Sequence, residues 1–570
     1  GMSDATPRDW HKQQMGLQQP STHIPAAGHH TRPAEAAYII RRIDEDPVAQ
    51  KWEKIFERME ILTDEDLDAI VRTEDGFGGM LHGTQDGGKS LMRDQVVSPG
   101  VIHMEEHVYR AKDAEHPKAK RCDGAKPTNN SEHGRREAAE LEAAIRHSCK
   151  LGVRQIRDLE WRLALIERAE RELAPLNREL RDALSPPHIR CTPFAHRSAV
   201  LEHVFMRAQK NPDIYVAVRS LLGTQVAGDL EPTHTWGCAE PTREAGLDFD
   251  DLPHAQWNEF VDKDVVRRAA MFPAEADAVF AKTMREVDKG LCDGPWEKED
   301  IDAMYGVDTN RTVRRFGVDQ KGDIRCIDNN KENLLNATSI GRDKLSMTKA
   351  DFPARMSDRF AHHKGRQTRG WSVGHGTEDV DAAYRRVLTM SPGYNVVAIF
   401  HPVLKRTVYF TLPGQVFGAV SAVTYFCAVP AFLLSVARRV LGIVASNFVD
   451  DVDVVALDVV GGVPQRALRR FFKIMGMPFS DAKHIPWGLT RTFCGVVTDF
   501  SLMRLRGVVK IYVDKARRDG IIELISSALE TQELYPKAAA TLAGKLQFSL
   551  SWAFGRVGKA AMQPINKRAE

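Results

Sequence analysis

The chain has few cysteines, and none of them stands at the spacing of a metal or redox motif. Its 570 residues contain eight cysteines, scattered along the sequence without a Cys-x-x-Cys pair. Zinc-binding modules and thiol oxidoreductases need closely spaced cysteines, so neither class is indicated. A secreted disulfide framework concentrates cysteine in a short chain and is not indicated either.

The sequence also lacks a charge excess. Lys and Arg number 79 against 77 Asp and Glu, so the chain as a whole is nearly neutral. Along the chain the balance is uneven, because residues 501–570 carry twelve Lys and Arg against six Asp and Glu. Such a basic segment fits a phosphate backbone, and it equally fits an ordinary solvated helix face.

Internal repeats and a recognisable secretory signal are missing, and only one long apolar run stands out. This run, Gly418 to Ala437, has about the length that spans a bilayer. Pro430 interrupts it and Arg438-Arg439 close it. The hydrophobic content of 43% and charged content of 27% are ordinary for a soluble globular protein. We therefore expect a buried core helix, no membrane partner and an intracellular location, nuclear or cytoplasmic.

The length allows two or more domains, and the pattern changes character along the chain. Residues 1–36 are rich in Pro, His, Gln and Gly, which predicts a disordered tail. Residues 37–240 form a mainly helical N-terminal extension, with a loop-rich segment over 73–134. Within it, apolar spacing predicts a helical pair over 135–184, ended by Ser185-Pro186-Pro187.

After residue 310 short β-like runs mix with helical patterns. Runs at Val396–Phe400, Val408–Leu412 and Val508–Val513 predict strands. Residues 380–390 and 419–439 predict helices. Mixed elements of this kind indicate an α+β domain.

Two adjacent carboxylates stand between two apolar runs. Phe448-Val449-Asp450-Asp451 separates Val440–Ser446 from Val452–Leu457, which predicts two strands joined by a tight turn. A turn presents both side chains at one exposed edge, where oxygen ligands hold divalent cations. Paired carboxylates hold the two ions of many phosphoryl-transfer enzymes, about 4 Å apart. Taken alone, an Asp-Asp turn is also what an ordinary solvated loop shows.

A second motif has the pattern of a nucleotide-binding loop. Residues 83–90, from Gly83 to Lys89-Ser90, satisfy the Walker A pattern. A phosphate-binding loop needs a buried strand before it and a helix after it. The preceding residues 75–82 are rich in glycine and do not read as a core strand. A P-loop ATPase therefore stays as an alternative that depends on Lys89.

Further segments are arranged around the Asp-Asp turn. Asp379 stands at a predicted strand end with Tyr384 five residues later, an arrangement that also fits an N-cap acid and a core tyrosine. Upstream lies a basic segment with Lys321 and Arg325, and between the two acidic sites lies Phe417-Gly418. Downstream follow Lys483 and then Phe493-Cys494-Gly495-Val496.

In this order, over about residues 280–560, these segments resemble the motif series of reverse transcriptases. The resemblance implies a right-hand polymerase with fingers (241–345), a palm built of an antiparallel sheet with packed helices (346–500) and a thumb (501–570). It assigns catalysis to Asp379, Asp450, Asp451 and Lys483, the last as general acid. The metal site would be formed by Asp379, the backbone of Val380, Asp450 and Asp451.

The same resemblance implies nucleotide-binding and primer-binding residues. Lys321 and Arg325 match the fingers residues that bind a triphosphate, and Tyr384 matches the ring that excludes a 2′-hydroxyl. Phe417 and Gly418 match the loop beside the incoming base, and Phe493, Cys494 and Gly495 match the primer-grip hairpin. Phe448 replaces the commoner tyrosine, and Pro413 lies farther from Phe417 than is usual. Whether Asp328 or Asn329 fills the family's acidic position is open.

The function implied is RNA-directed DNA synthesis with two Mg²⁺ ions, or Mn²⁺ in their place. The partners implied are an RNA and DNA template-primer and deoxynucleoside triphosphates. The alternatives are an RNA-dependent RNA polymerase on the same palm, and a catalytically silent polymerase-derived scaffold that binds RNA. Retention of all three aspartates favours an enzyme over the scaffold, and the ring of Tyr384 favours deoxynucleotides.

Overall fold

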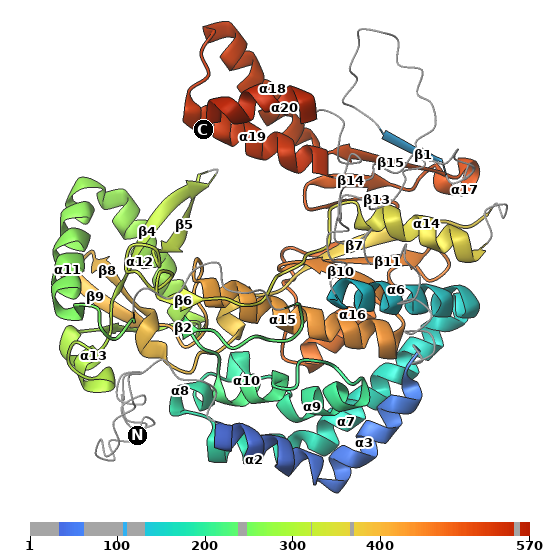
Figure 1. Cartoon of the computed structure of the whole chain (residues 1–570), viewed down its shortest axis with the longest axis horizontal. Helices are drawn as coiled ribbons and strands as arrows, with labels where there is room; N and C mark the ends of the chain where they lie inside the picture. The colour runs from blue at the N-terminus through green and yellow to red at the C-terminus, as the bar shows by residue number, and fades with distance from the viewer. Residues whose placement is uncertain are drawn as a thin grey trace, which may run out of the picture.

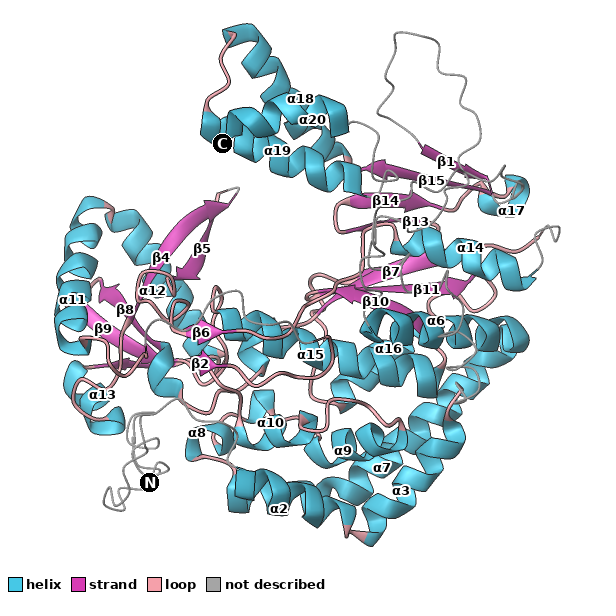
Figure 2. Cartoon of the chain, viewed as in Figure 1, coloured by secondary structure: helices cyan, strands magenta, loops and turns pink. Residues whose placement is uncertain are grey.

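The computed structural model describes residues 33–61, 107–110, 132–237, 248–320, 322–364, 370–551 and 559–569. Within them the protein combines helices with mainly antiparallel sheets, so the expected α+β class is confirmed (Figures 1 and 2). The Walker-like residues 83–90 and most of the segments 1–36 and 73–134 lie outside the described residues. Of the predicted tail, residues 33–36 open helix α2 (Pro33–Asp44).

An N-terminal helical layer lies along the bottom of Figure 1. The predicted helical pair is present as α6 (Glu132–Leu151) and α7 (Gln155–Leu184), separated by a 3₁₀ turn that begins at Gly152, where φ is 54°. The pair ends at Ser185, as predicted. The other helices of the layer are α3 (Pro47–Met59), α8 (Pro187–Arg190), α9 (Ala199–Ala208) and α10 (Val216–Leu222).

A five-stranded sheet with strand order β3-β9-β8-β4-β5 lies at the left of Figure 1. Its strands are β3 (Asp293–Trp296), β4 (Val313–Gln320), β5 (Asp323–Asp328), β8 (Val396–His401) and β9 (Arg406–Thr411). Helices α11 (His254–Met271), α12 (Pro273–Asp288) and α13 (Lys298–Tyr305) pack on it. The strands predicted at 396–400 and 408–412 are confirmed, and they pair within this sheet. A short parallel pair, β2 (Gly228–Asp229) and β6 (Ser339–Ile340), lies beside it.

A four-stranded antiparallel sheet with strand order β10-β11-β7-β12 forms the centre of the molecule. Its strands are β7 (Val373–Asp379), β10 (Val444–Phe448), β11 (Asp451–Leu457) and β12 (Ile485–Gly488). The helices around it are α14 (Phe352–Lys364), α15 (Val420–Val436) and α16 (Val463–Ile474). Because side chains alternate along a strand, Val452 and Val454 face the cluster of α15 and α16, whereas Val455 and Leu457 face α6 and α14.

The C-terminal part forms a further sheet and a group of helices. The sheet has strand order β1-β15-β14-β13, from β1 (His107–Arg110), β13 (Thr490–Phe493), β14 (Val496–Asp499) and β15 (Val508–Val513). Short α17 (Met503–Arg506) precedes β15. Helices α18 (Lys515–Thr531), α19 (Pro536–Ser551) and α20 (Lys559–Ala569) pack together at the top of Figure 1.

One hydrophobic core joins the N-terminal layer to the central sheet. Side chains of α3, α7 and α9 share a buried cluster with α15, α16 and β11. The ring centroids of Phe56 and Phe205 are 4.4 Å apart. The ring centroids of Phe205 and Phe471 of α16 are 6.3 Å apart. Helices α3, α7 and α9 therefore share the core on the α15 and α16 side of the central sheet and have no separate core, whereas α6 packs on the opposite face.

The apolar run at 418–437 forms α15, the core helix that its sequence predicts. Val420–Leu441 is long and apolar enough to cross a membrane, but 89% of the apolar window is buried inside the protein. A π-helical turn, Ala437–Leu441, continues the helix. The expectation of a buried core helix is confirmed.

The prediction of a helix over residues 380–390 is wrong. Only Ala383–Arg386 forms a 3₁₀ turn, preceded by Ala382 at φ 55°. Tertiary contacts override the local pattern, because Asp381 N–H donates to Pro478 O at 3.0 Å and Ser480 N–H donates to Asp379 O at 2.8 Å. These two bonds fasten the chain after β7 to the loop at 478–480.

Candidate catalytic site

Three aspartates from two distant segments meet at one end of the central sheet. Asp379 ends β7, and the strand register places it opposite Asp451, the first residue of β11. Asp450 precedes Asp451 in the two-residue turn Val449-Asp450, which the pairing of Phe448 with Asp451 closes. The predicted hairpin is confirmed, and the acids at 379 and at 450–451 are neighbours.

The turn is held in a strained shape from both sides. Val449 has φ 56°, a conformation rarely adopted by a β-branched residue. Asn447 Nδ2 donates to Val449 O at 2.8 Å, and Val380 N–H donates to Asp450 O at 3.1 Å. These two bonds fix Asp450 next to the end of β7.

The three carboxylates repel one another in a partly buried place. Burial, together with the neighbouring charges of Asp450 and Asp379, raises the pKa of Asp451 to about 6. Burial also raises the pKa of Asp379, although the ammonium of Lys483 lowers it. A bound cation would relieve this repulsion.

The three carboxylates do not form a preformed metal site. In the described part of the chain, no group of three or more His, Cys, Asp or Glu side chains is arranged so that it could hold a metal ion. Mg²⁺ is usually bound through one or two carboxylates together with water and substrate phosphates. Asp379, Asp450 and Asp451 are the residues here whose side chains offer the carboxylate oxygens that Mg²⁺ or Mn²⁺ takes as ligands.

Cation binding should weaken as the pH falls through about 6. The raised pKa of Asp451 means that this carboxylate is ionised only above that range and is protonated below it. Each pH unit below the pKa should cost up to about tenfold in affinity. Titration with Mn²⁺ followed by electron paramagnetic resonance at pH 5.0, 6.0 and 7.5 measures this. The Asp451→Asn variant should bind more weakly and lose this pH dependence, and an unaltered pH dependence in that variant would contradict the assignment.

Lys483 lies beside the first aspartate, as its predicted role requires. Its Nζ donates to Asp379 Oδ2 at 2.7 Å. The lysine side chain is 62% exposed, whereas the Asp379 side chain is 12% exposed. The ammonium is therefore close to the acids and open to a molecule in front of them.

Tyr384 and Phe417 form an aromatic group next to the acids. The Tyr384 ring meets Phe417 and Phe426 edge-on, with ring centroids 5.0 Å apart in each case. Burial raises the pKa of the Tyr384 hydroxyl to about 12, and the charge of Asp450 adds to the shift. The ring is thus fixed by packing beside the Asp450 turn.

The Phe417-Gly418 loop is held by asparagines of the segment after β5. Asn330 Nδ2 donates to Phe417 O at 3.1 Å, and Asn336 Nδ2 donates to Gly418 O at 2.7 Å. Gly418 has φ 89°, which favours glycine, and its exposed position leaves the loop accessible. Exposed Arg325 places its guanidinium carbon 5.6 Å from the centre of the Phe417 ring.

The structure describes only some of the positions that the resemblance assigns near Arg325. Lys321 lies outside the described residues. Asp328 is buried, with ion pairs to Arg315 at 2.7 Å and to Arg385 at 3.0 Å. Its charge is neutralised inside the fold, so Asp328 does not face the acids. Asn329 is partly exposed and donates to Glu332 at 2.7 Å.

The predicted primer-grip residues form a tight hairpin close to Asp451. Phe493 ends β13 and is buried, while Cys494 and Gly495 make the turn at φ 50° and 75°. Burial raises the pKa of the Cys494 thiol, and the charge of Asp451 acts in the same direction. A Cβ on Gly495 would lie 2.5 Å from the Arg517 guanidinium carbon, and its φ of 75° also favours glycine.

Val380 differs from the other predicted metal ligands because it contributes only its backbone. Its side chain is buried, and its carbonyl accepts a hydrogen bond from Ala383 N–H at 3.3 Å. One lone pair of this carbonyl is therefore engaged by the 3₁₀ turn.

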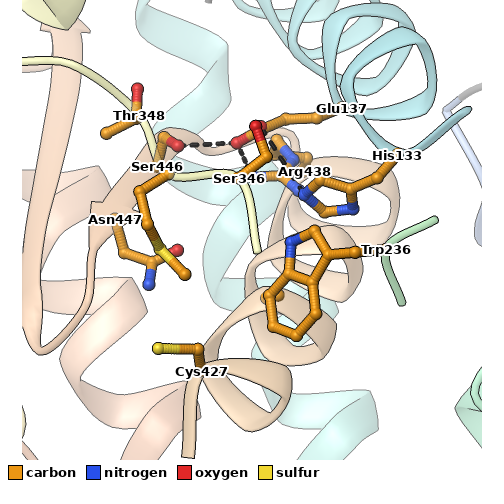
Figure 3. Close-up of a pocket in the computed structure, with 11 residues that line it drawn as sticks. His133, Glu137, Trp236, Ser346, Thr348, Cys427, Arg438, Ser446 and Asn447 are labelled. Carbon is orange, nitrogen blue, oxygen red and sulfur yellow. Dashed lines mark hydrogen bonds and ion pairs between the residues drawn. The ribbon is translucent and has the colours of Figure 1, made fainter. Parts of the chain in front are cut away.

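The back of the hairpin rests on the N-terminal layer (Figure 3). Glu137 of α6 accepts hydrogen bonds from Ser446 Oγ of β10 at 2.6 Å and from Arg438 Nη1 at 3.3 Å. These residues also line a small cavity, together with Asn447 and Trp236. Strand β10 is thus tied to helix α6 directly behind the Asp-Asp turn.

The sequence analysis missed several residues that hold the site together. Arg385 binds Asp328 and Gln415 O, Asn330 and Asn336 hold the Phe-Gly loop, and Glu378 anchors the segment around Lys483. A signal was available for Glu378, because a residue next to Asp379 on a strand must point to the opposite face. The others follow only from long-range pairing.

Comparison with known proteins adds little to this geometry. No protein-family model matches the chain, and no curated protein matches it. Among solved structures, the chain is similar to the foamy viral protease-reverse transcriptase dRH in complex with double-stranded DNA, at 13% sequence identity and a TM-score of 0.33. The match covers 50% of this chain and 41% of that chain. A similarity at this level does not establish a shared fold or a shared activity.

Proposed function

We propose that the chain is a template-directed nucleotidyltransferase, and more specifically an RNA-directed DNA polymerase with a right-hand architecture. The observation that carries the proposal is the meeting of Asp379 with Asp450 and Asp451 at one end of an antiparallel sheet. The order of the motifs around these acids resembles reverse transcriptases. The positions of Tyr384 and Lys483 beside the acids support the same function.

The proposed chemistry joins a primer 3′-hydroxyl to the α-phosphate of a nucleotide. Two Mg²⁺ ions, when bound, would lower the pKa of the attacking hydroxyl and neutralise the triphosphate. Asp379 and Asp450 would hold these ions, and Asp451 would assist on the primer side. The charge repulsion among the three carboxylates favours such binding.

The remaining residues would position the nucleotide and move a proton. Exposed Arg325 would contact the β- and γ-phosphates, for which a guanidinium is suited by its bidentate geometry. Lys483 would protonate the leaving pyrophosphate. Tyr384 would lie under the sugar and exclude a 2′-hydroxyl. Base pairing would supply sequence information, so the protein need only bind backbone and duplex shape.

Three alternative functions predict different experimental results. An RNA-dependent RNA polymerase would extend a primer with ribonucleotides. A silent scaffold would bind RNA and extend nothing, although it would not need all three aspartates. A P-loop ATPase would hydrolyse nucleotides in a reaction sensitive to Lys89 and indifferent to Asp450.

Primer extension tests the proposal directly. The protein is incubated with a labelled DNA primer on RNA or DNA template, with Mg²⁺ or Mn²⁺ and either nucleotide set. We expect template-dependent extension with deoxynucleotides on RNA. Tight template-primer binding without extension under every condition would contradict the proposal and favour the scaffold.

Replacing Tyr384 by Ala should relax sugar selection. Removal of the ring opens the space beneath the sugar, and we expect ribonucleotide use relative to deoxynucleotide use to rise by about 10- to 100-fold. Competing single-nucleotide incorporations measure the ratio. Tyr384→Phe keeps the ring and should keep the selection. Equal use of both nucleotides by the unaltered protein would show that Tyr384 is not a steric gate.

A further inference from the structure

The loop that carries Lys483 is fastened to the strand that carries Asp379 by a second set of bonds. Glu378 precedes Asp379 on β7 and points to the opposite face, where its side chain is 0% exposed. His484 Nδ1 lies 2.8 Å from Glu378 Oε1, and Gln465 Nε2 donates to the same oxygen at 2.8 Å. Two adjacent pairs, Asp379 with Lys483 and Glu378 with His484, therefore join the same strand to the same loop.

Arg469 of α16 connects strand β7 to the loop that carries Lys483. One end of its guanidinium donates to Glu378, and the other end donates to Asp481 at the start of the loop. Its side chain is 23% exposed, whereas the side chain of Asp481 is 97% exposed. The buried ring of Phe472 and the buried Leu468 fix the helix that presents Arg469.

Lys483 itself has few contacts that determine where its ammonium lies. Its side chain is 62% exposed, and a four-carbon stem rotates freely in water. Its position therefore depends on where the backbone of residues 481–484 is held. Arg469 bridges that segment to β7, since it binds a carboxylate in each.

We propose that Arg469 is a positioning residue for Lys483, acting through Glu378 and Asp481 to keep the ammonium within reach of the reacting phosphates. This inference rests on the function proposed above and deepens it. Proton transfer in the transition state contributes about 10²- to 10⁴-fold to a rate and depends on placement within hydrogen-bond distance. Loosening the loop should cost part of that factor and leave substrate binding intact.

The test is a double-mutant cycle on nucleotide incorporation under single-turnover conditions. Arg469→Gln should lower the incorporation rate about tenfold, with template-primer affinity unchanged. Arg469→Lys should recover part of the rate, because an ammonium reaches one of the two carboxylates. Arg469→Gln combined with Lys483→Met should be no slower than Lys483→Met alone. An additive loss in the double variant would overturn the inference.

Arg470→Gln provides the matched control. Arg470 is the next residue of α16 and donates to Glu167 of α7 at 2.7 Å, so its replacement removes a similar ion pair away from the loop. We expect it to keep the full rate, and an equal loss in both variants would overturn the inference. If Arg469→Gln unfolds the protein, Asp481→Asn removes the exposed end of the bridge and should give a several-fold loss that vanishes in the Lys483→Met background. An additive loss there would overturn the inference as well. No extension by the unaltered protein would instead overturn the proposed function, and this inference with it.

Discussion

Replacing Asp450 by Asn should abolish primer extension and leave the protein folded. The turn holds Asp450 beside Asp379, and an amide of the same shape supplies no negative charge to a cation. A metal ion acting on a phosphoryl centre contributes several kcal/mol, so we expect a rate loss of about 10³-fold or more. The fold should tolerate the change, because removing one of three crowded carboxylates reduces their repulsion. Single-nucleotide incorporation and the unfolding midpoint measure the two effects.

Asp381→Asn is the control for this variant. It removes the same charge two residues after Asp379, but the Asp381 side chain is 54% exposed and is paired with Arg386 at 2.8 Å. We expect its rate to stay within about threefold of the unaltered protein, because Asp381 is not among the proposed metal ligands and Arg386 already compensates its charge. A similar loss in both variants would show that the effect is general electrostatics. Full activity in Asp450→Asn would remove Asp450 from the catalytic centre.

The parts of the fold that the sequence predicts well are those with a strong local pattern. The Asp-Asp hairpin is bounded by apolar runs of strand length, and the helical pair over 135–184 has regular apolar spacing. The helix predicted at 380–390 failed for the opposite reason. Its residues favour a helix locally, but Asp381 N–H donates to Pro478 O and Ser480 N–H donates to Asp379 O, and these bonds hold a different conformation.

The order of the motifs predicts that the three aspartates are neighbours. It does not predict the strand register and the side-chain bonds that hold them in place. The pairing of Asp379 with Asp451 depends on strand register, and the bond from Arg469 to Glu378 joins residues 91 positions apart. Register and side-chain partners of this kind are set by the whole core, which local composition does not encode. The same limit applies to Asp328, because the sequence does not indicate its two buried partners, Arg315 and Arg385.

The contacts of the N-terminal extension could not be predicted either, because nothing in its sequence indicates what it packs against. Arg438, which is 2% exposed, binds Glu137 at 3.3 Å and Glu140 at 2.8 Å, and both acids belong to α6. The charge of Arg438 is the main influence that keeps the pKa of buried Glu140 low. Arg438 also donates to Ala445 O of β10, so this cluster joins the extension to the strand that leads to Asp450.

Replacing Arg438 by Met should therefore destabilise the protein by about 3–5 kcal/mol, the usual cost of leaving buried charges without their partner. The sign of its pH dependence follows from Glu140. Without Arg438 the strongest influence that lowers the pKa of Glu140 is gone, so this pKa rises and the loss of stability should be larger near pH 7 than near pH 5, where more of the carboxyl is protonated. Denaturant unfolding at both pH values measures this. Arg406→Met, which removes an exposed pair with Glu297, should cost less than about 1 kcal/mol. An equally small effect at Arg438 would mean that apolar packing alone holds the extension to the sheet.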